Sequence, residues 1–403
     1  MYITLSEAEL AFRREVQNFL DEKLSQRLRD AARATPSVFV EPDIGHEWQG
    51  ILREKGWLAH FWPKEYGGQG WTPIQRYIFE RECALARAPK IAGMGLKLLG
   101  PVICEFGTDK QKSEILEKIL SSKQIWCQGF SEPGAGSDLA SLKTKAALDD
   151  DGNYRINGSK IWTTHAHHAT HMFCLVRTNN ETKPQAGISF LLIDMDQPGV
   201  TVRPIIGIAG DHEVNEVFLD NAVASADNLV GEEGQGWTIA KFLLQNERGG
   251  SCFAPAILAE IDRVKDFAAS SPNGEGGYVS DNFDFSRSLA LIELEAKALE
   301  TTELRILSNL AKGRPPGPNT SIVKMVASSL RQKVDVAAMT VAGYAGIQLE
   351  TARPLYSNTA AEPLTSKMAQ LASPNYLNSR AWTIFGGTNE VQRTIIAKSA
   401  LSM

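Results

Sequence analysis

The spacing of apolar residues changes twice along this chain, and this change limits the possible folds more than any other feature. Residues 1 to about 124 repeat apolar side chains every three or four positions, as in EAELAFRREVQNFLDEKL and DKQKSEILEKIL. From about 125 to 232 the chain forms short runs rich in β-branched and aromatic residues, such as YRING, HMFCLV, ISFLLIDM and VTVRPII. The helical period then returns, so the order predicts an α+β fold.

We expect these stretches to form separate domains, because 403 residues suit two or three domains with shared interfaces. The expected domains are a helical one at 1–124, a compact β-sandwich or β-barrel at 125–232 and an antiparallel helical bundle at 233–403.

Charge and hydropathy exclude several classes of function. The 42 Lys and Arg residues against 47 Asp and Glu give a formal charge of -5, and no long basic run could bind a nucleic acid. The first residues predict an amphipathic helix and not a secretory signal. No apolar run approaches the roughly 20 residues that a membrane-spanning helix needs. We therefore expect a cytoplasmic protein without membrane insertion.

The segment GFSEPGAGSD, residues 129–138, is the most informative part of the β-rich region. Its glycines allow close backbone approach, and its serine hydroxyls are small donors, which suits an oxygen-rich ligand beside a planar ring. Taken alone, the segment predicts only a turn between strands. It lacks the GxGxxG spacing of a dinucleotide-binding fold, so it does not indicate a Rossmann domain.

A second segment, GSKIWTTHA, follows some twenty residues later. Trp162 could lie against a planar ring such as a flavin, with the hydroxyls of Thr163 and Thr164 near the polar edge of that ring. Ordinary core packing explains the tryptophan equally well, and periodicity leaves both interpretations open.

Five segments, WPKEYGG, SEPGAGSD, NGSKIWTT, GEEGQGW and FGGTNEVQR, occur together in this order. In order and approximate spacing the chain resembles the acyl-CoA dehydrogenase family over most of its length. The resemblance implies an N-terminal helical domain, a central β-barrel and a C-terminal four-helix bundle, with FAD between barrel and bundle. It also implies an acyl-CoA substrate and an electron-transfer flavoprotein as electron acceptor.

Carried over motif by motif, the resemblance implies two sets of contacts. Those with FAD come from Gln128, Phe130, Ser131, Ser137, Trp162, Thr163, Thr164, Thr388 and Glu390. Those with the substrate come from Ser137, near the thioester and pantetheine arm, and from Arg248, Gly386 and Gly387. Arg248 has only a supporting role, because it directly follows the predicted base, Glu247, and adjacent residues on a helix face in different directions.

The reaction needs a carboxylate that takes the alpha proton while a hydride leaves the beta carbon. Many family members carry this glutamate just before the GT of the terminal motif, where this chain has Gly386. A second group, resembling isovaleryl- and long-chain-type enzymes, carries it on the first bundle helix, where this chain has Glu247. Glu247 also continues the apolar stripe of Trp237, Ala240 and Leu244. We predict that Glu247 is the base; a buried structural ion pair is the alternative.

The resemblance fails where the bundle normally holds the ADP half of FAD across a subunit interface. The expected arginine region reads DFAASSPNGEGG, and the glycine motif is reduced to MTVAGYAG, residues 339–346. Either rebuilt loops or an unlike subunit must supply these contacts, so we expect a homo- or hetero-oligomer. Two other functions stay open: a non-catalytic partner subunit, and an acyl-CoA oxidase or flavin monooxygenase of the same fold.

The run HAHHATH contains His165, His167, His168 and His171, and imidazoles are common metal ligands. Strand alternation would place His165, His167 and His171 on one face. No acid or cysteine accompanies them, so we expect no metal site and place the run beside the flavin or the subunit interface.

Overall fold

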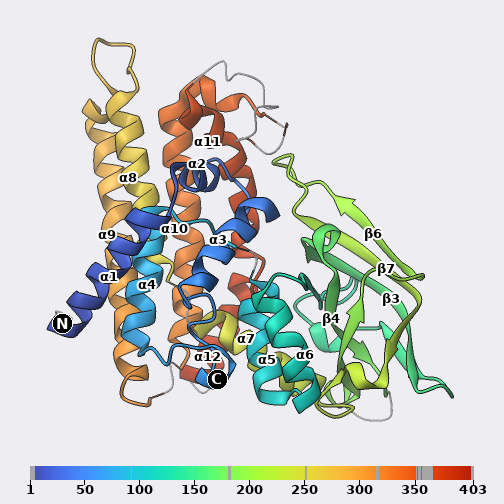
Figure 1. The fold of residues 1–403 in the computed structure, drawn as a ribbon. Helices are drawn as coiled ribbons and strands as arrows, with labels where there is room; N and C mark the ends of the chain where they lie inside the picture. The colour runs from blue at the N-terminus through green and yellow to red at the C-terminus, as the bar shows by residue number, and fades with distance from the viewer. Residues whose placement is uncertain are drawn as a thin grey trace.

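The computed structural model describes residues 5–400 except 92, 180–182, 250–251, 315–316, 351, 353–354 and 356–365; the side chains of 245–249 also lie outside the described part. Helices come first, strands follow and helices end the chain, which confirms the α+β prediction. Figure 1 shows the sheet on one side of the molecule and the long helices on the other, with the N-terminal helices against both.

The N-terminal part consists of short helices with well-defined starts. They are α1 Glu7–Lys23, α2 Gln26–Arg33, α3 Pro42–Glu54, α4 Pro73–Ala86, η2 Met94–Leu99, α5 Gly100–Phe106 and α6 Asp109–Leu120. Ser6, Thr72 and Thr108 each form a capping box, in which the hydroxyl accepts from the third helical amide and that residue's side chain returns the bond. These local signals explain why the helices begin where they do.

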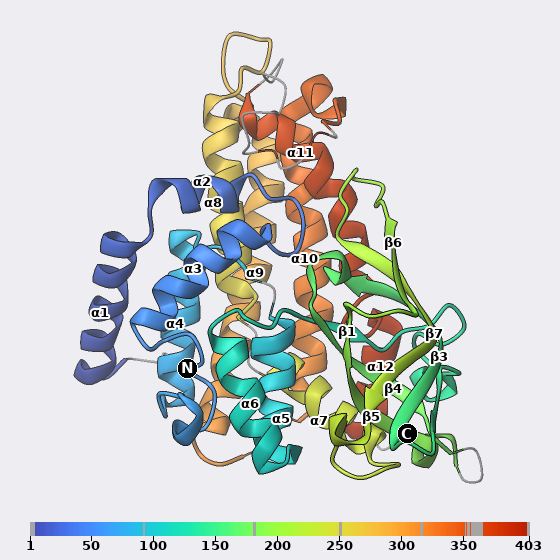
Figure 2. The ribbon, with the colours of Figure 1, turned by 45° about the vertical axis from the view of Figure 1, so that its right-hand side comes forward.

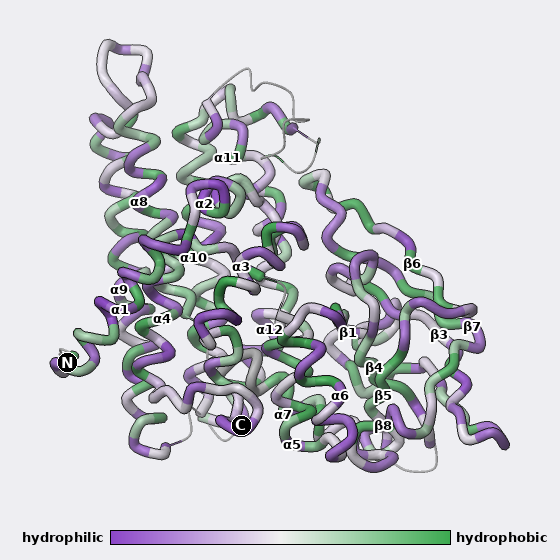
Figure 3. The backbone as a smooth tube through the Cα atoms, viewed as in Figure 1, coloured by the Kyte–Doolittle hydropathy of each residue, from purple (hydrophilic) through white to green (hydrophobic). Residues whose placement is uncertain are grey.

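One mixed sheet of eight strands forms the middle part. Its strands are β1 Trp126–Gly129, β2 Lys145–Leu148, β3 Asn153–Thr164, β4 His171–Arg177, β5 Ile188–Asp194, β6 Val200–Ile205, β7 Val214–Ser225 and β8 Leu229–Val230. Their order is β6-β7-β3-β2-β4-β5-β8, and β1 pairs in parallel with β4. The predicted strand segments are confirmed. The hydrophobic colouring of β4 and β5 in Figure 3 agrees with their burial on both faces.

The C-terminal part is the predicted helical bundle. Its helices are α7 Gly236–Gly249, α8 Ala254–Ser270, α9 Phe283–Leu310, α10 Asn319–Ala342, α11 Lys367–Asn378 and α12 Asn389–Ala400. The long helices α8, α9 and α10 lie side by side in Figures 1 and 2, and α10 also packs against α11 and α12. No helix in the described ranges is both long enough and apolar enough to cross a membrane.

Helix α7 packs against the N-terminal helices and the sheet, and it does not share the hydrophobic core of the long bundle helices. Its buried residues Ile239, Ala240 and Leu243 belong to the hydrophobic core shared by the N-terminal helices and one face of the sheet. The long bundle helices form a second core of their own. The helix that carries residue 247 is therefore fixed where the three parts of the chain meet.

Candidate active site

A buried ion pair fastens the glycine-rich loop to strand β3. Lys160 is 0% exposed, and its Nζ lies 2.8 Å from Oε1 of Glu132, within the SEPGAGSD loop. The ammonium also donates to the carbonyls of Leu175 at 2.7 Å and Phe130 at 3.3 Å. All three donors of the buried ammonium are thus satisfied, which offsets the cost of burying its charge.

The carboxylate of Glu132 organises the loop on its other side. It accepts from the backbone amides of Lys143 at 2.6 Å and Thr144 at 2.9 Å. Burial opposes its ionisation, but the charge of Lys160 and these hydrogen bonds hold the pKa of Glu132 below its ordinary value. A side chain at Gly134 or Gly136 would meet no other atom within 4 Å, so this edge of the loop faces open space.

Trp162 stands out among the tryptophans of the chain. A β-bulge between Lys160 and Thr163 displaces it, its φ is 60°, and the residue is 59% exposed. A left-handed conformation costs a non-glycine residue roughly 1–2 kcal/mol. The adjacent amide of Ile161 donates to the Ser131 carbonyl at 2.9 Å, which ties this bulge to the loop. Core packing is therefore wrong as an explanation of Trp162; the ring is presented on the surface beside the loop.

The other predicted flavin contacts differ in what their side chains can reach. Phe130 is buried against Phe173 and Phe190, so its ring is part of the core. Thr163 is buried as well, and its Oγ1 has no hydrogen-bond partner among the described residues. The rest are more accessible: Gln128, Ser131 and Thr164 are half-buried and Ser137 is exposed. All these contacts stay predictions.

The terminal motif forms a tight turn before α12. Gly386 has φ 64° and Gly387 has φ 83°, and the Gln392 amide donates to both carbonyls at 3.2 Å. The Thr388 hydroxyl accepts from the amide of Val391 and so caps the helix. Glu390, on the first turn, is exposed. A glutamate at position 386 would have to adopt the left-handed conformation, so this turn suits glycine better than a base.

Helix α7 carries the predicted base. Its buried face consists of Ile239, Ala240 and Leu243. Trp237 and Leu244, which the sequence placed in the middle of this face, lie at its edges and are half-buried. Position 247 lies four residues after Leu243 and seven after Ala240, which is the same face by helical period. The side chains of Glu247 and Arg248 lie outside the described residues.

The histidine run does not alternate along one strand, so that prediction is wrong. His165 has φ 54° and opens the 3-10 turn Ala166–His168, whereas His171 begins β4. The turn breaks the strand because the left-handed residue redirects the backbone.

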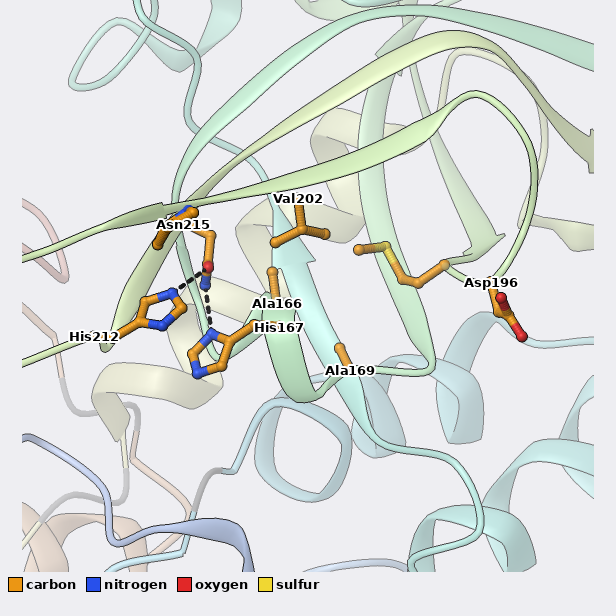
Figure 4. Close-up of a pocket in the computed structure, with 9 residues that line it drawn as sticks. Ala166, His167, Ala169, Asp196, Val202, His212 and Asn215 are labelled. Atoms are coloured by element: carbon orange, nitrogen blue, oxygen red, sulfur yellow. Dashed lines mark hydrogen bonds between the residues drawn. The ribbon is translucent and has the colours of Figure 1, made fainter. Parts of the chain in front are cut away.

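A residue absent from the sequence analysis, Asn215, joins this run to a fifth imidazole, that of His212. Its Oδ1 lies 2.7 Å from His212 Nε2, and its Nδ2 lies 3.0 Å from His167 Nδ1 and donates to the Thr163 carbonyl at 3.0 Å. The rings of His167 and His212 stack with centroids 3.8 Å apart. Figure 4 shows this pair at the edge of a cavity of about 370 Å³.

Burial and the neighbouring imidazoles favour the neutral forms of His165, His167 and His168. Burial first, and then His168 and His212, lower the pKa of His165 to about 4 and that of His167 to about 3. Burial likewise lowers the pKa of His168. Within the part of the chain that the structure describes, no three His, Cys, Asp or Glu side chains are grouped to hold a metal ion.

Glu213 connects all three parts of the chain next to this cluster. Its carboxylate accepts from the Val38 amide at 2.8 Å and from Nδ2 of Asn378 at 3.3 Å, and its carbonyl accepts from the His165 amide. Burial raises its pKa despite these hydrogen bonds. The partners of its carboxylate are 165 to 175 residues distant along the chain, so no sequence pattern could have identified it.

Three sequence models of one family together match almost the entire chain. They are described as the N-terminal, middle and C-terminal domains of acyl-CoA dehydrogenase and match residues 6–123, 127–222 and 234–401. The chain belongs to the acyl-CoA dehydrogenase family. It is thus an FAD-dependent oxidoreductase of the class that acts on CH–CH groups, and the family fold is confirmed.

Relatives of known name agree with this membership. Acyl-CoA dehydrogenase IpdE1 of Mycobacterium tuberculosis is 36% identical over 88% of this chain and 87% of its own length. FadE26 of the same organism is 30% identical over 100% of this chain and 99% of its own. Among solved structures, the ChsE4-ChsE5 complex from M. tuberculosis aligns with a TM-score of 0.80 at 27% identity, over 100% of this chain and 99% of that chain. The Tcur3481-Tcur3483 steroid ACAD gives 0.83 at 26%, with the same coverage.

The described residues of this acyl-CoA dehydrogenase fit the ring end of FAD better than the ADP end. Trp162 offers an exposed ring, and the loop beside it is open at Gly134 and Gly136. At the reduced glycine motif, α10 ends at Ala342 and Tyr344 is 93% exposed.

Proposed function

We propose that this chain dehydrogenates an acyl-CoA thioester between its alpha and beta carbons and passes the electrons to an electron-transfer flavoprotein. The observation that carries the proposal is Trp162, an exposed ring in a strained backbone conformation, tied to the loop of the SEPGAGSD motif. Strained residues persist where the surrounding structure determines them and cluster at ligand sites. Family membership supplies the chemistry that such a site would serve.

FAD, when bound, supplies the acceptor for the hydride from the beta carbon. In our proposal Glu247 takes the alpha proton, because helical period places it on the face of α7 that packs inward. The left-handed turn at Gly386 and Gly387 supports this role, since the alternative position has no carboxylate. Trp162, Ser131 and Thr164 would border the flavin ring, and Ser137 the thioester.

A non-catalytic role in a complex of unlike chains is the second candidate. Gly386, which replaces the usual glutamate, favours it, and two similar solved structures are named as pairs of chains. Glu247 on α7 argues against it, because a purely structural subunit needs no acid at that position. We propose the catalytic role and an oligomeric assembly.

Flavin spectra test the proposal directly. The purified chain, with any partner that co-purifies, should show visible flavin bands that bleach without oxygen when a suitable acyl-CoA is added. A panel of straight, branched and polycyclic acyl-CoAs would identify the acyl group. Rapid oxygen consumption on adding substrate would instead assign an oxidase or monooxygenase, and the absence of both flavin and bleaching would leave only the partner-subunit role.

A further inference from the structure

Exposed apolar side chains lie directly before Gly386, in the region of the proposed substrate site. Ile384 is 63% exposed and Phe385 is 41% exposed. The ring of Phe385 contacts that of Trp382, in the 3-10 turn Ser379–Thr383, with centroids 5.7 Å apart. These two aromatic rings form an apolar wall that leads away from Gly386.

The far end of this wall is a lysine. Lys90, in the connection between α4 and η2, places its ammonium 5.1 Å from the centre of the Trp382 ring. The Lys90 carbonyl accepts from the Val40 amide at 3.0 Å, so its backbone is fixed by the same segment whose Val38 amide binds Glu213. Lys90 is exposed, and a ligand can therefore reach its side chain.

Lys90 differs from the neighbouring cations because it has no acidic partner. The guanidinium of Arg331 lies 5.7 Å from the centre of the same tryptophan ring, and it is paired with Asp335 at 3.0 Å. Lys97 lies 3.8 Å from Glu80. Among the described residues, no carboxylate lies within 4 Å of the Lys90 ammonium. An unpaired ammonium beside an apolar wall suits a ligand that offers an oxygen acceptor.

The surroundings of Lys90 also change its pKa. Solvent reaches the side chain, but protein atoms surround it closely. This burial first, and then the charges of Arg331 and Lys97, lower the pKa of Lys90 to about 8, while Glu213 and Glu80 oppose the shift. The ammonium form therefore dominates at neutral pH and is lost as the pH rises above about 8.

We propose that Lys90 selects acyl groups that carry a keto or carboxylate oxygen at their distal end. The inference rests on the proposed function, in which Gly386 borders the substrate. Trp382 is four residues before Gly386, at most about 14 Å by chain length, so a long or polycyclic acyl group can extend from Gly386 along the two rings. The rings would contact its apolar part, and the ammonium would donate to its distal oxygen.

The test compares acyl-CoAs of equal chain length that end in a methyl, a keto or a carboxylate group, over a series of lengths. The FAD-loaded protein, with any partner that co-purifies, is reduced by each compound, and the rate of flavin bleaching gives kcat/KM. At least one of the two oxygen-bearing endings should exceed the methyl ending by about tenfold, because hydrogen bonds from a charged donor are strong. The ending with the larger ratio identifies the source of the oxygen.

Two variants and a pH profile separate recognition by Lys90 from a structural role. Lys90→Met should lower the preference for the oxygen-bearing ending to about twofold or less, and Lys90→Arg, which keeps the charge, should recover most of it. In the wild type the preference should fall as the pH rises above about 8, because kcat/KM reports the protonation state of the free enzyme. Lys90→Arg should not show this fall, because arginine stays protonated.

Lys55→Met is the matched control. The Lys55 ammonium also lies over a tryptophan, 4.5 Å from the centre of the Trp57 ring, but it pairs with Glu15 at 3.0 Å. This variant should keep the full preference for the oxygen-bearing ending.

Three results would refute the inference: equal kcat/KM for all endings in the wild type, an unchanged preference in Lys90→Met, or an equal loss in Lys55→Met. In each case bleaching by the methyl-ended compounds would still support the proposed function. A protein that no acyl-CoA of the series bleaches would refute the proposed function, and this inference with it.

Discussion

The ammonium of Lys160 and the carboxylate of Glu132, 28 positions apart in the sequence, form a buried ion pair at 2.8 Å that joins two sequence motifs. The loop of the first motif and the bulge of the second are held in fixed positions by this pair. Trp162 follows two residues after Lys160, so the position of the ring that we propose to border the flavin depends on this buried ion pair.

We expect Lys160→Met to destabilise the protein by about 3–5 kcal/mol, because it leaves the carboxylate of Glu132 buried without its partner. Denaturant unfolding measures this loss, and FAD release should accompany it. Arg53→Gln is the matched control: Arg53 pairs with Glu117 at 2.6 Å on the surface, and exposed pairs contribute about 0.2–1 kcal/mol. Equal effects of the two substitutions would show that burial of the Lys160 pair is unimportant.

Trp162→Ala should raise the FAD dissociation constant about tenfold, since aromatic ring contacts contribute about 0.5–1.5 kcal/mol beyond area burial. The free energy of unfolding of the apoprotein should fall by less than about 0.5 kcal/mol, because the side chain of Trp162 is mostly exposed. Trp57 is buried, so Trp57→Ala should cost about 3–5 kcal/mol with or without FAD. A melting temperature of Trp162→Ala that falls equally with and without FAD would contradict the cofactor role.

The fold could be predicted from the sequence because it rests on local signals. Periodicity located the helices and most strands, and the order of motifs identified the family. The site was only partly predictable, because the ion pair and hydrogen bonds that fix it join residues far apart in the sequence. Lys160 and Glu132 are charged and would be expected in solvent, and Asn215 bonds residues about 50 positions earlier. Backbone conformation was also hidden: nothing in the letters WTT indicates that Trp162 is left-handed and exposed.

Glu247→Gln should keep FAD and the fold but lower the rate of flavin bleaching by several orders of magnitude, because an amide cannot accept the alpha proton. Stopped-flow reduction by an acyl-CoA that bleaches the wild type measures this step. Glu247→Asp is the conservative control and should recover part of the rate. More than a tenth of the wild-type rate in Glu247→Gln would make Glu247 a structural residue.

The histidine cluster should make the protein acid-sensitive. The folded-state pKa values of His165 and His167 are depressed to about 4 and about 3, so below the ordinary value of about 6.5 the unfolded chain binds more protons. Stability should therefore fall as pH drops from about 6.5 towards 4, by about 1.4 kcal/mol per pH unit for each imidazole protonated only on unfolding. Unfolding free energies between pH 5 and 7.5 measure the slope, and His167→Gln should reduce it. An unchanged slope would exclude a contribution from His167.

The poorly formed site for the ADP end of FAD predicts that this chain assembles with another. Residues 266–286, where the family arginine is expected, contain no Arg or Lys, and the loop there closes on itself through the pairing of Pro272 with Tyr278. Tyr344 and Ile347, at the reduced glycine motif, are exposed apolar residues that a partner chain would cover.

A homo-oligomer would repeat the same reduced glycine motif and the same region without arginine in every copy, whereas an unlike chain could supply both contacts to the ADP half of FAD. We therefore expect a hetero-oligomer. The measurement is FAD per chain and particle size for this chain expressed alone and with a candidate partner. An empty or insoluble product rescued by co-expression would support the unlike partner; one FAD per chain in a stable dimer or tetramer of identical subunits would refute it and leave the dehydrogenase proposal intact.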